Sequence, residues 1–319
     1  MSVPPDLSIV IPLHNEVDNV EPLHAELLAA LAQTGRSAEL LFVDDGSTDG
    51  TFERLRGLHE RSAAEPAAPR VRVLRLRRRF GKSAALAAAF EEARGGIVFT
   101  MDGDLQDDPK EIPRFLEKLE EGYDLVSGWK RERHDPWHKV LPSRLFNRVV
   151  SCVSGVRMHD FNCGFKAYRA EVVRELTLYG DLHRFVPVLA HAKGFRVGEI
   201  VVQHRPRTHG RSKYGVKRLF TGFLDLLTVL LVTSYASRPL HLFGGIGLLG
   251  FGAGVGINVY LAILWLAGER PIGQRPLLTA GVLLMILGIQ LISLGLIGEM
   301  IVSRHEGRRR TYSVAERLD

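Results

Sequence analysis

The sequence predicts an α/β domain with a mostly parallel sheet, followed by a hairpin of two membrane-spanning helices. Two observations lead to this class. Up to about residue 204, short runs rich in β-branched residues alternate with Ala-, Leu- and Glu-rich segments of helical spacing. After about residue 215, the chain holds two long runs with almost no charge. Strand–helix alternation is typical of a sheet covered by helices on both faces.

The first part of the chain is expected to contain five strands with four helices between them. The strands are predicted at residues 7–12, 39–43, 71–76, 96–100 and 124–128, and the helices at about 17–33, 50–62, 82–94 and 110–121. In such sheets, ligands bind beyond the carboxyl ends of the strands. This rule brings together three polar loops, with sequences H-N-E, D-D-G-S and D-G-D-L-Q, which follow the first, second and fourth strands.

The two uncharged runs are predicted to span a membrane, because each exceeds the roughly 20 residues that a bilayer requires. The expected division is a domain at 1–213, an interfacial helix at 214–236, spans at 239–267 and 277–303, and a basic tail at 304–319. Lys and Arg crowd both outer flanks of the hairpin. The positive-inside rule then places both termini and the first domain in the cytoplasm. A core hairpin of a soluble protein is disfavoured, since this domain is too small to cover two such helices.

Composition limits the classes of partner. The 319-residue chain has a formal net charge of +6 and a pI of about 9.4, which suits an anionic membrane surface or a phosphorylated substrate. No zinc-finger, basic-zipper or RNA-recognition signature is present, so we expect no nucleic acid partner. Two cysteines, Cys152 and Cys163, are too few for a disulfide framework.

The stretch M-D-G-D-L-Q-D-D-P, residues 101–109, ends a predicted buried strand in four carboxylates. An EF-hand loop is excluded, because its Gly and Glu positions hold Asp107 and Pro113. A phosphoaspartyl hydrolase is disfavoured, because no partner Lys or acidic residue stands at a convincing position. Asp107 or Asp108 suits the N-cap of a helix that begins at Pro109.

The remaining oxygen ligands of this stretch favour a divalent metal. Asp102 and Asp104 alternate at the strand end, and Gln106 adds a further hard oxygen. Such ligands suit Mg²⁺ or Mn²⁺ that also carries substrate phosphates. The nearby F-G-K-S at 80–83 is not a phosphate loop, because Leu76 stands where that loop needs Gly. Two interpretations of residues 77–82 stay open: a basic wall that contacts a phosphate or a lipid headgroup, and a solvated surface.

Five motifs occur in the order typical of the inverting family 2 glycosyltransferases. They are I-P-L-H-N-E, V-D-D-G-S-T-D-G-T, M-D-G-D-L-Q-D-D-P, D-F-N-C-G-F-K-A-Y-R and H-G-R-S-K-Y-G. The chain resembles in particular the polyprenyl-phosphate glycosyltransferases, over residues 7 to about 303. This resemblance implies a Rossmann-like GT-A catalytic domain.

The resemblance also implies the residues of the site. Donor contacts are expected from Pro12, His14, Glu16, Asp44, Asp45, Asp102, Gly103 and Asp104. The metal ligands are expected to be Asp102, Asp104 and Gln106. Acceptor and phosphate contacts are expected from Arg131, Arg144, Arg207, Ser212 and Lys213. Catalytic roles fall to Asp104 and Asp160, and Asp160 is expected to position the acceptor rather than act as a base.

The function that follows is inverting transfer of one hexose from a nucleotide sugar to polyprenyl phosphate, at the cytoplasmic face of the membrane. Donors of the UDP-glucose or GDP-mannose type are expected. A processive polysaccharide synthase is an alternative, but Q-x-x-R-W is missing and two spans are few for a channel. A non-catalytic sugar-binding scaffold is a second alternative, although it has no need for a metal triad. The Gly-rich first span allows close helix packing within one chain or in a homo-oligomer.

Overall fold

The computed structural model describes residues 4–65, 68–131, 147–152, 154–205, 228, 239–269, 273 and 275–305. The chain divides into two compact units, residues 1–229 and 230–319. Within the predicted interfacial helix, only Thr228 is described, and the predicted tail is described only up to His305. Arg144, Arg207, Ser212 and Lys213 lie outside the described residues.

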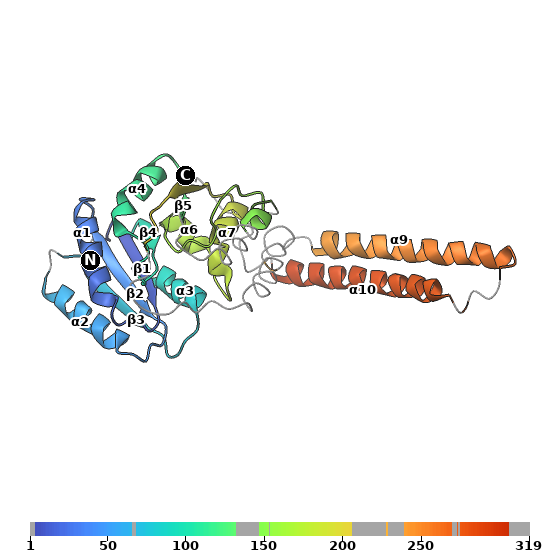
Figure 1. Cartoon of the computed structure of the whole chain (residues 1–319), viewed down its shortest axis with the longest axis horizontal. Helices are drawn as coiled ribbons and strands as arrows, with labels where there is room; N and C mark the ends of the chain where they lie inside the picture. Colours follow the sequence, from blue (N-terminus) through green and yellow to red (C-terminus); the bar gives the residue numbers. More distant parts are fainter. Residues whose placement is uncertain are drawn as a thin grey trace. The chain divides into compact units, whose positions relative to one another are not determined.

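The first unit is built on a seven-stranded sheet (Figure 1). The strands pair in the order β3-β2-β1-β4-β6-β5-β7, and only β6 runs antiparallel to its neighbours. Their bounds are β1 (Leu7–Leu13), β2 (Ala38–Asp44), β3 (Arg70–Arg75), β4 (Ile97–Thr100), β5 (Leu125–Trp129), β6 (Lys166–Arg169) and β7 (Val197–Val201). The expected mostly parallel sheet is confirmed. The sequence patterns missed β6 and β7.

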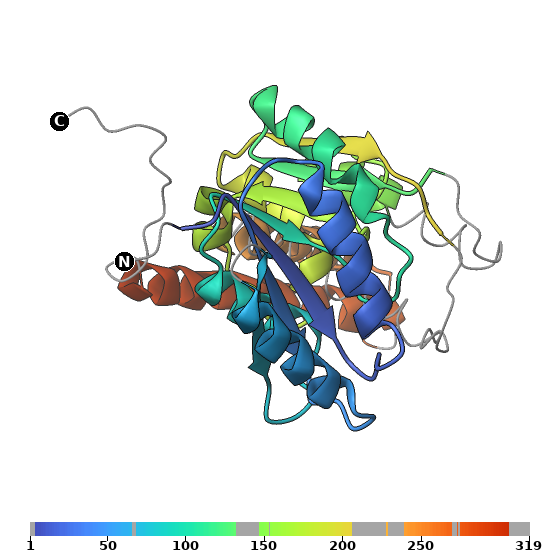
Figure 2. The ribbon, with the colours of Figure 1, turned by 90° about the vertical axis from the view of Figure 1, so that its left-hand side faces the viewer.

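Helices cover both faces of this sheet, with α1, α2 and α4 gathered on one face (Figure 2). The helices are α1 (Val20–Ala32), α2 (Thr51–Ala64), α3 (Lys82–Glu92), α4 (Ile112–Glu120), α6 (Ala170–Glu175) and α7 (Val186–Ala192). Two 3-10 helices, η1 (Pro109–Glu111) and η2 (Leu182–Arg184), complete the described set. In α1, burial of Val20, Leu23, Leu27 and Leu31 follows helical spacing, so one stripe of the helix meets the sheet.

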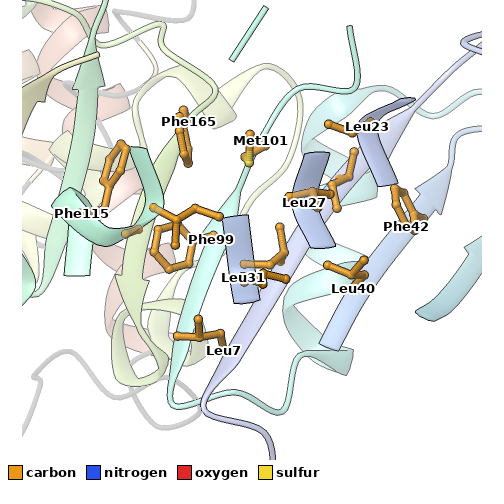
Figure 3. Packing of buried hydrophobic residues seen from close by; sticks show 14 of the residues in the cluster. Leu7, Leu23, Leu27, Leu31, Leu40, Phe42, Phe99, Met101, Phe115 and Phe165 are labelled. Carbon is orange, nitrogen blue, oxygen red and sulfur yellow. The ribbon is translucent and has the colours of Figure 1, made fainter. Parts of the chain in front are cut away.

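The core on this face joins strand and helix side chains that are distant in sequence (Figure 3). Phe99 from β4 meets Phe115 from α4 edge to face, with ring centroids 6.0 Å apart. Phe115 also packs on Phe165, at 4.4 Å between centroids. Aromatic pairs of this kind contribute beyond the area that they bury. They fix the position of α4 relative to the end of β4, and the acidic stretch connects these two elements.

The second unit contains α9 (Pro239–Leu266) and α10 (Pro276–His305). Both helices are long and apolar enough to cross a membrane. They approach closely at glycines: a Cβ at Gly247 would lie 2.6 Å from the carbonyl oxygen of Gly288, and one at Gly254 would lie 2.6 Å from that of Gly281. Small residues allow such backbone contact between membrane helices. The expected two-helix hairpin is therefore confirmed as a packed pair.

The two glycines Gly254 and Gly252 provide a matched test of this packing. Gly254→Ala should lower the melting temperature of the full chain in detergent, because the new methyl group meets backbone; overpacking typically costs about 1–3 kcal/mol. Gly252→Ala should have no such effect, since nothing lies within 4 Å of the point that a Cβ would occupy there. Fluorescence of Trp265 reports on this unit when Trp129 and Trp137 are replaced by Phe. Equal melting temperatures for the two variants would contradict the packing.

Candidate active site

Three loops meet at the carboxyl edge of the sheet because β1, β2 and β4 are parallel neighbours. Leu13, the last residue of β1, pairs in register with Asp44 at the end of β2. On the other side of β1, Val10 pairs with Thr100 at the end of β4. The loops after these three strands carry most of the predicted donor and metal residues. The sheet therefore brings them together as the sequence predicts.

The first two loops brace each other through hydrogen bonds. His14 Nδ1 lies 2.8 Å from the carbonyl oxygen of Asp45. The amide of Asn15 donates to Ser47 Oγ at 2.9 Å, and the Asn15 side chain accepts from the amide of Thr48 at 2.9 Å. Asn15 has a left-handed backbone, with φ of 55°, a conformation that Asn tolerates better than most residues. These contacts fix the edge where Pro12, His14 and Glu16 are predicted to line the nucleotide pocket.

Asp44 and Asp45 have different partners. Asp44 is fully buried, accepts the amide of Ser47 at 3.0 Å, and has Arg75 at 3.7 Å. Asp45 accepts the amide of Phe80 at 2.6 Å and that of Gly81 at 2.8 Å. The Asp45 carboxylate therefore fastens the loop between β3 and α3 to the edge of the sheet.

The acidic stretch after β4 is neutralised by cations from three other parts of the chain. Lys82 at the start of α3 forms an ion pair with Asp102. Lys130, directly after β5, lies 2.7 Å from Asp107. Arg205, beyond β7, lies 2.6 Å from Asp108. Burial alone would raise the pKa of the Asp102 carboxyl, but the ammonium groups of Lys82 and Lys130 outweigh this and hold the pKa below its ordinary value.

The structure shows which of Asp107 and Asp108 caps the helix that follows. Asp108 is the N-cap of η1, and its carboxylate accepts the amide of Lys110 at 3.0 Å. Pro109 occupies the first helical position, as predicted. Asp107 is not a cap. It is buried against Lys130 and also accepts the amide of Asp102, at 3.3 Å.

The segment between Asp102 and Asp107 has the chemistry of a hard-cation site. Gly103 packs so closely on β1 that a Cβ there would lie 2.0 Å from Leu13 Cδ2. Leu105 has a φ of 62°, an unfavourable backbone for Leu that is held by the surrounding structure. The side-chain nitrogen of Gln106 donates to the carbonyl oxygen of Arg205 at 3.3 Å, and the side-chain oxygen takes no part in this bond.

These donors fit a divalent cation that shares its ligands with a substrate. Asp104 and Gln106 carry oxygens of the hard kind that Mg²⁺ and Mn²⁺ prefer, and Asp102 forms an ion pair with Lys82. Within the described ranges, no group of three or more His, Cys, Asp or Glu residues is placed to hold a metal ion by itself. Phosphate oxygens of a bound diphosphate would have to complete the coordination.

A buried polar pocket adjoins Asp102. Its lining includes Lys82, Thr100, Asn162, Lys166, Tyr168 and His183. His183 Nδ1 lies 2.9 Å from Ser83 Oγ, and burial together with the neighbouring Lys82 lowers the His183 pKa to about 2. Burial also lowers the pKa of Lys166. Lys82 lies in the F-G-K-S sequence, and its ion pair with Asp102 was not predicted.

The predicted acceptor residues are described only in part. Asp160 is buried, and its carboxylate accepts the amide of Asn162 at 3.1 Å, which shapes the loop that leads into β6. Arg131 is exposed directly after Lys130. The roles of these two residues stay predictions.

Comparison with known proteins agrees with the predicted fold and family. Residues 8–177 match the family described as Glycosyl transferase family 2, which is more than half of the chain. A solved structure of glucosyl-3-phosphoglycerate synthase from Mycobacterium tuberculosis, with Mn²⁺, UDP and phosphoglyceric acid, has a TM-score of 0.54. It is 20% identical and covers 72% of this chain and 78% of its own, so the likeness shows the GT-A fold.

Two relatives are similar over nearly the whole chain. Dodecaprenyl-phosphate galacturonate synthase of Rhizobium johnstonii is 39% identical over 305 residues, 93% of this chain and 87% of its own length. Undecaprenyl-phosphate 4-deoxy-4-formamido-L-arabinose transferase of Edwardsiella ictaluri is 36% identical over 296 residues, 92% of this chain and 88% of its own. The chain belongs to glycosyl transferase family 2, and its relatives are polyprenyl-phosphate glycosyltransferases.

The two hydrogen bonds from the Phe80 and Gly81 amides to the Asp45 carboxylate give a local prediction. Asp45→Asn should expose the Phe80 and Gly81 amides, because a side-chain amide offers only one acceptor oxygen to two donors. A hydrogen bond to a charged group contributes about 1.5–3 kcal/mol, so loss of the bond to the carboxylate should raise exchange of these amides with D₂O at least about tenfold. Hydrogen-exchange mass spectrometry of peptides that contain residues 80–81 checks this. The variant Glu53→Gln, at an exposed position, is the control. Unchanged exchange in Asp45→Asn would show that the Asp45 carboxylate does not hold the β3–α3 loop.

Proposed function

We propose that this protein transfers a single sugar from a nucleotide sugar to polyprenyl phosphate at a membrane, with inversion at the anomeric carbon. The observation that carries this proposal is the sheet edge at which Asp44 and Asp102 meet the basic side chains of Arg75 and Lys82, in a chain with two membrane-length helices. The curated relatives bear names of transferases or synthases that act with polyprenyl phosphates. The hexose donors UDP-glucose and GDP-mannose stay predictions.

The donor half of the reaction depends on stabilising a leaving diphosphate. Negative charge develops there as the bond to the anomeric carbon breaks. Asp104 and Gln106 would hold Mg²⁺ or Mn²⁺ together with the diphosphate, and the bound cation would offset the developing charge. The Mycobacterium tuberculosis synthase was solved with Mn²⁺ and UDP, which supports this choice of cation. Lys82 adds a fixed positive charge beside Asp102.

The acceptor half needs little base catalysis. A phosphate monoester has a second pKa of about 6, so at neutral pH much of the acceptor is already a dianionic nucleophile. Asp160 is buried and hydrogen-bonded to its own loop, which suits a positioning role better than proton abstraction. The arginine and lysine residues predicted to bind the acceptor phosphate are Arg131, Arg144, Arg207 and Lys213, with Ser212.

The membrane arrangement completes the proposal. Helices α9 and α10 would anchor the chain, and the basic flanks predict that both termini and the catalytic domain face the cytoplasm. An anionic lipid acceptor would then meet the site at headgroup level.

Transfer activity tests the proposal directly. The purified full chain is given labelled nucleotide sugars, undecaprenyl phosphate and Mn²⁺, and the lipid product is separated and identified. We expect one sugar per lipid, and loss of transfer when EDTA removes the cation. Asp104→Asn should lower the rate by about 10²–10³-fold, the usual effect of losing one group that stabilises developing charge.

Two controls make this assay decisive. Glu21→Gln breaks only a surface ion pair with Arg61 and should leave transfer within about twofold, because exposed pairs contribute little. Unaltered thermal melting shows that Asp104→Asn is folded. A polymeric product, full activity of Asp104→Asn, or no transfer from any donor would each count against the proposed function.

A further inference from the structure

The segment that follows β7 lies against the acidic stretch. The Arg205 amide donates to the carbonyl oxygen of Gln106 at 3.0 Å, and the Gln106 side-chain nitrogen donates to the carbonyl oxygen of Arg205 at 3.3 Å. Next to them, Asp107 and His204 form an isolated antiparallel bridge. The predicted donor and metal motif is therefore paired with a segment that lies 99 positions later in the sequence.

The carbonyl oxygen of Arg205 determines which end of the Gln106 carboxamide points toward it. A backbone carbonyl only accepts hydrogen bonds, so it attracts the nitrogen of a carboxamide and repels the oxygen. The nitrogen is therefore held on Arg205, and the oxygen occupies the other branch of the same planar group. A hard cation binds the oxygen of a carboxamide and not its nitrogen. The contact thus fixes the position of the one atom of Gln106 that suits such a cation.

The Arg205 side chain fixes the position of this segment through two ion pairs. Its Nη2 lies 2.6 Å from Asp108 Oδ2, and its Nη1 lies 2.7 Å from Glu26 Oε2 on α1. The Asp108 side chain is 11% exposed and that of Glu26 is 38% exposed, so the pair with Asp108 is the better shielded from water. One planar guanidinium thus joins α1 and the cap of η1 to the residue whose carbonyl holds Gln106.

We propose that Arg205 is a positioning residue of the donor site, which holds Gln106 in the orientation that binds Mg²⁺ or Mn²⁺ beside the nucleotide diphosphate. Arg205 acts through Gln106 and is not itself a ligand. This rests on the proposed function and adds to it a residue that lies outside all five sequence motifs. Groups that orient a metal ligand contribute to metal affinity although they do not touch the metal.

Two binding constants of the full chain in detergent test this role. The first is Kd for Mn²⁺ at saturating UDP, obtained from the EPR signal of free Mn²⁺. The second is Kd for UDP in EDTA, obtained by calorimetry. Arg205→Met should raise the Mn²⁺ Kd about 10–100-fold, the usual effect of losing a group that orients a metal ligand. The UDP Kd in EDTA should stay unchanged, because the variant removes no contact with the nucleotide. A purely structural role would change both constants or neither.

Three further variants follow from the ion pairs. Arg205→Lys keeps a positive charge but not the planar fork, so it should restore part of the Mn²⁺ affinity that Arg205→Met loses. Glu26→Gln removes only the more exposed pair, so it should raise the Mn²⁺ Kd less than Arg205→Met does. Arg61→Met is the matched control, because it breaks another arginine pair with α1, to Glu21 at 2.6 Å, and should leave both constants unchanged.

The outcomes separate this inference from the proposed function. An unchanged Mn²⁺ Kd in Arg205→Met overturns the role of Arg205, and so does a loss of UDP affinity in EDTA that equals the loss of Mn²⁺ affinity. In both cases, binding of Mn²⁺ with UDP by the unaltered chain still supports the proposed function. If the unaltered chain binds no Mn²⁺ in the presence of UDP, both the inference and the proposed use of a cation are contradicted. Retained UDP affinity in EDTA shows that Arg205→Met is folded.

Discussion

The acidic stretch at residues 102–108 depends on cations supplied from elsewhere in the chain. Four carboxylates within seven residues would repel one another at the end of a buried strand. Lys82, Lys130 and Arg205 each pair with one of them, and they come from the start of α3, the end of β5 and the segment after β7. The charge of the stretch is therefore balanced by both halves of the sheet, so the site depends on the completed fold for its electrostatics.

The carboxyl edge of the sheet therefore has an acidic part and a basic part side by side. The carboxylates and amide oxygens of Asp104 and Gln106 suit a hard cation and its diphosphate. The buried side, where Lys82, Lys166 and His183 line a small pocket, lies next to Asp102, because Lys82 forms an ion pair with that carboxylate. The polyprenyl acceptor and the apolar hairpin fit the same account, because the lipid keeps the acceptor at the membrane.

The sequence predicted the parts of the molecule whose patterns are local. Strands β1, β2 and β4 are continuous apolar runs, and their observed bounds differ from the predicted ones by one residue at most at either end. Strand β6 was missed because its buried Lys166 breaks the apolar pattern, whereas the equally short β4 is uniformly apolar up to Thr100. The capping role of Asp108 could be predicted from the sequence, since a cap is a local contact. The ion pairs Lys82–Asp102 and Lys130–Asp107 could not be predicted, because residues 20 or more positions apart meet only through the sheet topology.

The central claim is that the carboxyl edge of β1, β2 and β4 holds the nucleotide diphosphate through a cation at the acidic stretch. An experimental structure of the full chain with UDP and Mn²⁺, with the anomalous signal of the metal recorded, tests it most directly. The account predicts one metal peak bonded to oxygens of Asp104, of Gln106 or of both, and to both phosphates, with the uracil near Asp44 and His14. A nucleotide bound away from this edge, or diphosphate bound there with Lys82 and no metal, would contradict it.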